Sequence, residues 1–113
     1  MRNWVKSAID EHRHLEVLLD RLENAIKDGN CEAEFSAARS ALAAHYRQED
    51  SHWKSAGVHK PASQHAEVLE LADGVEEALA MGHSRDALAT VRRFLALASH
   101  NLIEEERDWF PLL

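Results

Sequence analysis

The stretch that decides the fold is CEAEFSAARSALAAHYRQEDSHWKSA, residues 31–56. One set of positions in it recurs at alternating spacings of three and four residues, which is the spacing of one face of an α-helix. Such a row is typical of the seam that a helix presents to the other helices of a bundle. The row consists of Cys31, Phe35, Ala38, Leu42, His45, Glu49, His52 and Ala56. Imidazole and carboxylate groups in an otherwise apolar seam indicate that the seam does more than pack.

Three short segments divide the chain, because each combines a glycine that stops a helix with a residue suited to the start of the next one. They are KDGN at 27–30, with Asn30 as an N-cap, AGVHKP at 56–61, and MGHS at 81–84, with Ser84 as an N-cap. The sequence therefore predicts helices near 3–27, 31–56, 61–81 and 84–110. Short connections make neighbouring helices antiparallel, so we expect an all-α, up-down-up-down four-helix bundle that forms a single domain over residues 1–113.

The composition narrows the function classes. Hydrophobic residues make up 45% of the chain, with only 4 Gly and 2 Pro, which favours a packed helical domain. The net charge of −7 argues against a nucleic-acid partner, because an acidic surface repels phosphates. No apolar run is long enough to predict a signal peptide or a membrane span, and a single cysteine, Cys31, fits a reduced, cytoplasmic setting.

The two halves of the chain resemble each other. A shift of 53 residues places His12 on His65 and much of the 12–29 segment on residues of similar type. A shift of 55 residues places His45 on His100 and Glu49 on Glu104. We therefore expect an internal duplication of a helical hairpin, which would pair each imidazole with a counterpart.

These paired residues are expected to converge. In an antiparallel bundle with a rise of about 1.5 Å per residue, they lie at nearly the same depth, measured from Trp4, Trp53 and Trp109 at one end. Buried carboxylates are costly unless a cation neutralises them, and imidazole with carboxylate suits iron, manganese or zinc. The expected metal ligands are His12, His45, Glu49, His65, His100 and Glu104. Such a set can bind two ions, with the carboxylates as bridges.

The segments EHRHLEVLLDRL, LAAHYRQED, QHAEVLELADGVEEAL and LASHNLIEEERDWFPLL resemble the four helices of hemerythrin-like (HHE cation-binding) domains. The resemblance covers nearly the whole chain, and residues 100–113 are its most specific part. It implies a hemerythrin-like four-helix bundle with two non-haem iron ions bridged by carboxylates. It also implies binding of O2 or a related small ligand, and the same six ligands.

One position departs from the family. Oxygen-carrying hemerythrins have a second histidine four residues after the first on the third helix, and here that residue is Leu69. The vacancy leaves room for solvent or for another ligand. Tyr46 and Glu16 are additional candidate ligands, because Tyr46 follows His45 directly and Glu16 lies one helical turn after His12.

Several functions are compatible with this pattern. The first is a di-iron protein that binds O2, peroxide or nitric oxide in sensing, storage or stress response. The alternatives are a di-iron peroxidase or oxidase, an iron-sensing module, and a metal-free helical interaction module. The sequence leaves the catalytic residues, if any, unassigned.

The last predicted helix carries a second apolar row that lies opposite His100 at ideal helical pitch. The row consists of Val91, Leu95, Ala98, Leu102 and Trp109. Either neighbouring helices wrap around this row or a second copy of the chain covers it. We expect a homodimer through this helix.

Overall fold

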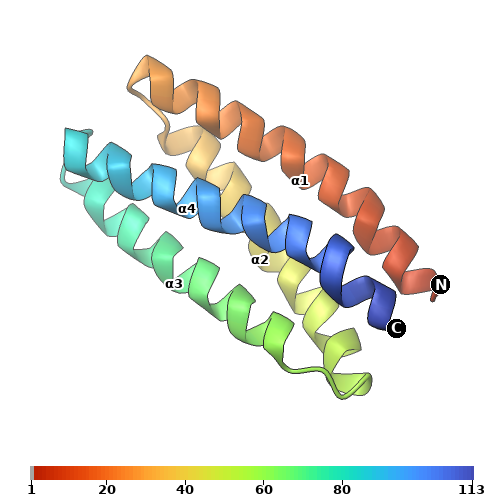
Figure 1. The fold of residues 1–113 in the computed structure, drawn as a ribbon. Coiled ribbons are helices and arrows are strands. Elements are labelled where there is room, and N and C mark those ends of the chain that lie inside the picture. Colours follow the sequence, from red (N-terminus) through yellow and green to blue (C-terminus); the bar gives the residue numbers. More distant parts are fainter. Residues whose placement is uncertain (1) are drawn as a thin grey trace.

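Four antiparallel helices form an elongated bundle in the computed structural model, which describes residues 2–113 (Figure 1). They are α1 (Asn3–Asp28), α2 (Glu32–Ser55), α3 (Lys60–Ala80) and α4 (Arg85–Glu104). A turn of π-helix (Glu105–Trp109) and a 3-10 turn (Phe110–Leu112) follow α4 directly. Both α1 and α3 pack against α2 and α4, so the described residues form the all-helical bundle that was predicted.

The helix ends lie within about two residues of their predicted positions, except that α4 gives way to the π-helical turn before residue 110. Gly29 adopts a left-handed conformation (φ 81°) and its N–H bonds to the Ile26 carbonyl, as expected of a helix-stopping glycine. The Ser84 hydroxyl caps α4 by accepting a hydrogen bond from the Ala87 N–H. Asn30 does not cap α2, because that helix begins one residue later and Cys31 occupies the N-cap position.

The register of α4 differs from the one expected. The residues of this helix that face the core are Ala87, Val91, Phe94, Ala98, Asn101 and Leu102. Their spacing follows the seam of α2, displaced by 56 residues instead of 55, so Ala87 corresponds to Cys31 and Val91 to Phe35. The second apolar row is therefore the core face of α4, apart from the partly buried Leu95 and Trp109. The apolar row on which the expected homodimer rested is therefore buried within the chain itself.

The core has two parts. Most buried side chains form one continuous cluster along the bundle axis, with contributions from all four helices. A smaller cluster at the end that holds both termini contains Val5, Ala8, Trp53 and Phe110, with Trp4 and Trp109 packed against it. We call this smaller cluster, including the two outer tryptophans, the aromatic cap. No helix among residues 2–113 combines the length and the apolar character needed to cross a membrane.

The register of α4 can be tested by two adjacent substitutions. Leu102 is buried and Ile103 is 56% exposed. We expect Leu102→Ala to lower the free energy of unfolding by about 2–4 kcal/mol, because it leaves a cavity in the core. Ile103→Ala should change that free energy by less than about 0.5 kcal/mol. Urea denaturation of both variants in the presence of a chelator measures the difference, and equal effects would contradict the register described here.

Candidate metal centre

Five ionisable side chains from α1, α2, α3 and the π-helical turn converge inside the bundle, next to the aromatic cap. Four of them are residues expected from the sequence, and the fifth is Glu105, which was not. All five are at most 4% exposed. The cluster consists of His12 on α1, His45 and Glu49 on α2, His65 on α3, and Glu105 at the start of the π-helical turn.

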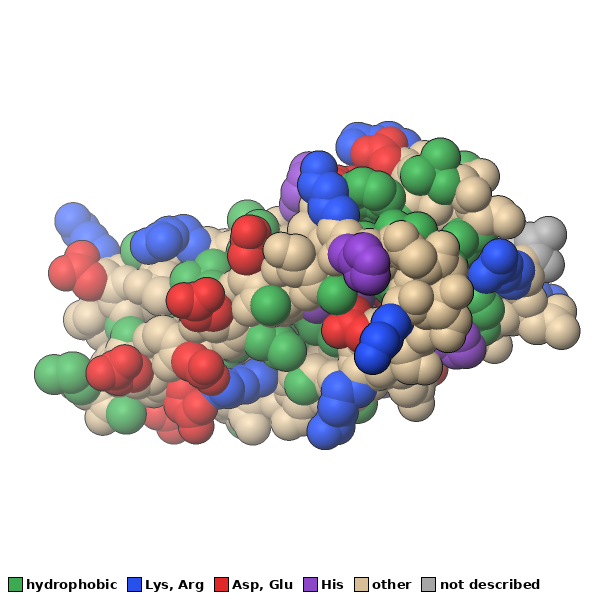
Figure 2. Space-filling model, turned by 90° about the horizontal axis from the view of Figure 1, so that it is seen from below, with side chains coloured by type: hydrophobic (Ala, Val, Ile, Leu, Met, Phe, Trp, Pro, Cys, Tyr) green, Lys and Arg blue, Asp and Glu red, His purple; other side chains and the backbone are tan. Residues whose placement is uncertain are grey.

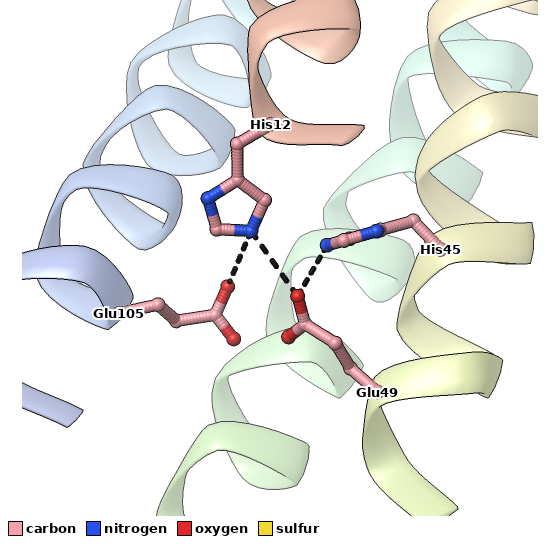
Figure 3. Close-up of side chains that lie close together, drawn as sticks. All are labelled: His12, His45, Glu49 and Glu105. Carbon is pink, nitrogen blue, oxygen red and sulfur yellow. Dashed lines mark hydrogen bonds and ion pairs between the residues drawn. The ribbon is translucent and has the colours of Figure 1, made fainter. Parts of the chain in front are cut away.

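One side of the cluster is formed by His12 and His45. The His12 Nε2 atom lies 3.1 Å from Glu49 Oε2 and 3.3 Å from Glu105 Oε1. The His45 Nε2 atom also contacts Glu49 Oε2. Figure 3 shows these four side chains pointing toward one another, and one donor atom from each lies within 4.8 Å of the others. This spacing is compatible with one cation bound among them.

The opposite side of the cluster is formed by His65. Its Nε2 atom lies 2.9 Å from Glu105 Oε2 and 3.6 Å from Glu49 Oε1. Each of the two glutamates therefore directs one oxygen toward His12 and the other oxygen toward His65. A carboxylate placed in this way can bridge two cations.

A second layer of carboxylates holds the outer nitrogen of each imidazole. His12 Nδ1 is 2.9 Å from a Glu106 oxygen, and His65 Nδ1 is 2.6 Å from an Asp50 oxygen. His45 Nδ1 pairs with Glu11. An imidazole that donates its Nδ1 proton outward is fixed in the tautomer whose Nε2 lone pair points inward, and metal-binding histidines are commonly held in this way.

The electrostatics of the metal-free cluster follow from this geometry. Burial by itself lowers the pKa of His12, but hydrogen bonds with Glu105 and Glu49 outweigh it and raise this pKa to about 10. The pKa values of His45 and His65 are also raised, in each case by carboxylate partners that outweigh the effect of burial. Burial also opposes ionisation of Glu49, but hydrogen bonds with His12 and His45 lower its pKa. The pKa of Glu105 is raised by burial and by the nearby charge of Glu49.

Two buried polar atoms near the cluster are unpaired. Tyr46 Oη and Asn101 Oδ1 have no hydrogen-bond partner among the described residues. Tyr46 stacks on the His65 ring, with ring centroids 3.9 Å apart and an interplanar angle of 7°. Unpaired buried polar atoms are rare in native proteins, so a concentration of them here indicates an unfilled bonding requirement.

The aromatic cap covers one end of the cluster. The Phe110 ring lies 5.6 Å from the His12 ring, centroid to centroid, and the Trp53 indole N–H donates to Glu49 Oε1 at 3.3 Å. The π-helical turn makes this cover possible, because its wider winding lets Glu105 and Phe110, five residues apart, both face the core. On the face drawn in Figure 2, the visible histidine side chains gather in the half of the molecule nearer the termini.

His100 and Glu104 do not join the cluster, which corrects the expectation for the fourth helix. The side chain of His100 is 61% exposed and its Nε2 pairs with Glu104 Oε2 at 2.9 Å. Glu104 also accepts hydrogen bonds from Gln64 and Trp109, and these bonds lower its pKa. The apolar residues that precede them set the register, so the inward positions of the H-x-x-x-E spacing are taken by Asn101 and Glu105.

The two additional candidates differ in placement. The Glu16 side chain is 42% exposed and pairs with Arg13, so it lies outside the cluster. Arg13 also pairs with Glu106, the residue that holds His12. Tyr46 is buried against His65, but its hydroxyl contacts none of the five cluster residues through a hydrogen bond.

No protein-family model, curated protein or solved structure matches this chain.

The raised histidine pKa values predict how the metal-free protein responds to pH. A pKa raised from 6.5 to about 10 stabilises the fold fully below pH 6.5, and this stabilisation is lost as the pH rises through 10. For His12 the loss between pH 6.5 and 9 is on the order of 3 kcal/mol. Urea denaturation with a chelator present should show the decrease in the free energy of unfolding. His12→Gln should flatten the dependence, and an equally steep dependence in that variant would contradict the assignment.

Proposed function

We propose that this protein is a metal-binding four-helix bundle that holds two cations. Iron is the leading candidate for the metal, and a small ligand binds to the bound ions. His12, His45 and His65 would be terminal ligands, and Glu49 and Glu105 would bridge. The resemblance to hemerythrin-like domains supports iron as the metal, and O2, peroxide or nitric oxide as the ligand. Manganese and zinc are the other metals compatible with a set of imidazole and carboxylate donors.

The observation that carries the proposal is the orientation of the three imidazoles. Each Nδ1 faces an outer carboxylate, and each Nε2 faces the oxygens of Glu49 or Glu105. A nitrogen lone pair and a carboxylate oxygen repel each other unless a proton or a metal ion lies between them. The cluster must therefore hold positive charge at its centre, supplied by protons in the metal-free protein and by cations in the loaded one.

A purely structural role accounts less well for the same residues. Five carboxylates surround three imidazoles, so the negative charges outnumber the positive ones even if every imidazole is protonated and every carboxylate ionised. Buried ionic groups rarely stabilise a fold more than apolar residues of similar volume would. The unpaired atoms Tyr46 Oη and Asn101 Oδ1 add to the cost. Bound cations would offset both costs.

The residues of the chain would divide the work as follows. The outer carboxylates fix the imidazole tautomers, and the two glutamates set the separation of the cations. The aromatic cap limits the access of water from the nearer end of the bundle. Iron, when bound, would supply reversible redox chemistry and open positions for a small ligand, while the protein supplies orientation and a low-dielectric setting.

Adjacent glutamates provide a matched test of the ligand set. We expect wild-type protein, purified without chelator and loaded anaerobically with iron(II), to retain close to two ions per chain. Glu105→Gln should weaken iron binding by about tenfold or more, because it removes one bridge from the cluster. Glu104→Gln, one residue away and outside the cluster, should weaken iron binding far less, because the new amide oxygen can still accept the hydrogen bond from Gln64. Metal analysis after dialysis against a range of free iron(II) concentrations measures both.

Two results would contradict the proposal. One is wild-type protein that retains far less than one ion per chain. The other is an equal loss of affinity in Glu104→Gln and Glu105→Gln. Circular dichroism of both variants shows whether each is folded, and His45→Gln with His100→Gln forms a second matched pair of a cluster residue and a surface residue.

Small-ligand binding has a separate test. Nitric oxide added to the iron(II)-loaded protein should produce new visible absorption that saturates with the iron content of the sample. The same addition to iron-free protein is the control. Absence of any spectral change in the loaded protein would remove the ligand-binding part of the proposal and leave the metal-binding part standing.

A further inference from the structure

The contacts of the cluster repeat around an approximate two-fold axis. His12 contacts one oxygen of each glutamate, and His65 contacts the other oxygen of each. The outer carboxylates follow the same relation, because they lie one residue after Glu49 and one residue after Glu105. The equivalent pairs are His12 and His65, Glu49 and Glu105, and Asp50 and Glu106. The first pair is displaced by 53 residues, and the other two by 56.

The symmetry is broken at one pair of positions. On one side, His45 directs Nε2 into the cluster and pairs through Nδ1 with Glu11, the residue before His12. On the other side, the residue 56 positions after His45 is Asn101, and it pairs with Gln64, the residue before His65, at 3.3 Å. An amide pair therefore stands where the symmetry would place an imidazole and a carboxylate. We call the two sides the His45 half and the Asn101 half.

The hydrogen-bond network fixes which end of the Asn101 amide stays free. The Glu104 carboxylate can only accept when ionised, so the Gln64 amide nitrogen donates to it at 2.7 Å. The Gln64 oxygen therefore faces Asn101 and accepts from Asn101 Nδ2. The oxygen of Asn101 remains without a partner, although the residue is only 3% exposed. Asn101 occupies the sequence position that corresponds to His45 of the other half.

The two halves offer different donors. The His45 half presents two imidazole nitrogens and two carboxylate oxygens. The Asn101 half presents one imidazole nitrogen and two carboxylate oxygens, and a neutral amide residue stands at the sequence position that corresponds to the second imidazole. A neutral amide is a weaker ligand for a borderline metal than an imidazole, so the second set holds such a cation less firmly. The third-helix position at which hemerythrins have a second histidine provides no additional ligand here, because Leu69 occupies it and packs against the apolar core.

The other unpaired atom near this half belongs to Tyr46. Its ring lies flat on the His65 ring and its side chain is only 1% exposed. The hydroxyl has no hydrogen-bond partner among the described residues. A buried hydroxyl with no acceptor can donate a hydrogen bond to a small anion or polar molecule bound beside His65.

We propose that the two cation positions are inequivalent, and that the Asn101 half is the weaker, exchangeable one, where a small anionic or polar ligand binds. This inference rests on the proposed function and adds to it the place of ligand binding. Cobalt(II) is a suitable probe, because its visible absorption reports the number and kind of its ligands. Azide serves as the small anion.

The experiment is a cobalt(II) titration of the metal-free wild-type protein. We expect two binding steps whose affinities differ by about tenfold or more. Azide should leave the spectrum of the one-equivalent complex unchanged and alter the spectrum of the two-equivalent complex. Tyr46→Phe should weaken azide binding to the two-equivalent complex and leave both cobalt(II) affinities in place.

A double variant can give the Asn101 half the imidazole and the carboxylate that it lacks. Asn101→His with Gln64→Glu would give the Asn101 half the same residue types as His45 and Glu11. We expect this variant to bind the second cobalt(II) at least about tenfold more tightly than wild type, with a weaker response to azide. His100→Gln, on the adjacent surface position, is the control and should titrate like wild type.

The outcomes separate the two proposals. Two equal affinities in the wild type, or an azide response at one equivalent, would overturn the inference and leave the metal-binding function intact. Binding of a single equivalent at every concentration would overturn the inference and the two-cation part of the proposed function, and would leave metal binding itself in place. Absence of cobalt(II) binding would overturn the proposed function together with the inference. The wild-type titration decides these cases by itself if the double variant does not fold.

Discussion

The arrangement of the polar residues inside this bundle depends on two buried carboxylates. Glu49 and Glu105 lie in the bundle interior, and both of their oxygens face imidazole nitrogens. Carboxylates in a low-dielectric interior require compensating positive charge. The three histidines, their outer carboxylate partners and the aromatic cap are all arranged around that requirement. Each outer carboxylate comes from a different helix than the imidazole it holds, so the same contacts also tie the helices together at this level.

The bundle turns this local requirement into a defined geometry. Its four helices bring residues up to 94 positions apart into hydrogen-bond contact, as in the pair of His12 and Glu106. The apolar seam along the remaining length fixes the rotation of each helix. That rotation decides which polar residues reach the centre. Along α4 and the turn after it, the seam places Asn101 and Glu105 inside, and leaves His100 exposed and Glu104 outside the cluster. Function in this chain therefore depends on the packing of residues that carry no chemistry of their own.

The sequence predicted much of this arrangement. The prediction that was wrong, the register of the fourth helix, was wrong for a physical reason. The breakers at Gly29 and Ser84 marked the helix ends, and the clear seam of residues 31–56 correctly placed His45 and Glu49 in the interior. The fourth helix was misaligned by one residue, because His100 and Glu104 have the same i,i+4 spacing as Asn101 and Glu105. A one-residue error rotates a helix by about 100° and moves the residues expected inside to the flank of the helix.

The correct signal for the fourth helix was present in the apolar residues. Val91, Ala98 and Leu102 form a row that requires burial, by neighbouring helices or by a second copy of the chain, and in the structure the neighbouring helices bury it. Aligning the two halves on their apolar seams gives a shift of 56 and places Glu105 opposite Glu49. The hydrogen bonds of Gln64 and the outer carboxylates could not be predicted, because they depend on side-chain conformations that sequence spacing does not determine.

The contact between the Trp53 indole and Glu49 has an optical consequence. A tryptophan buried at 3.3 Å from a cluster carboxylate emits in an environment that changes with whatever lies beside that carboxylate. A paramagnetic metal ion at such close range quenches the fluorescence of the indole. The molecule thus carries an intrinsic fluorophore beside its buried cluster, and the occupancy of the site could be followed through emission intensity without any added dye.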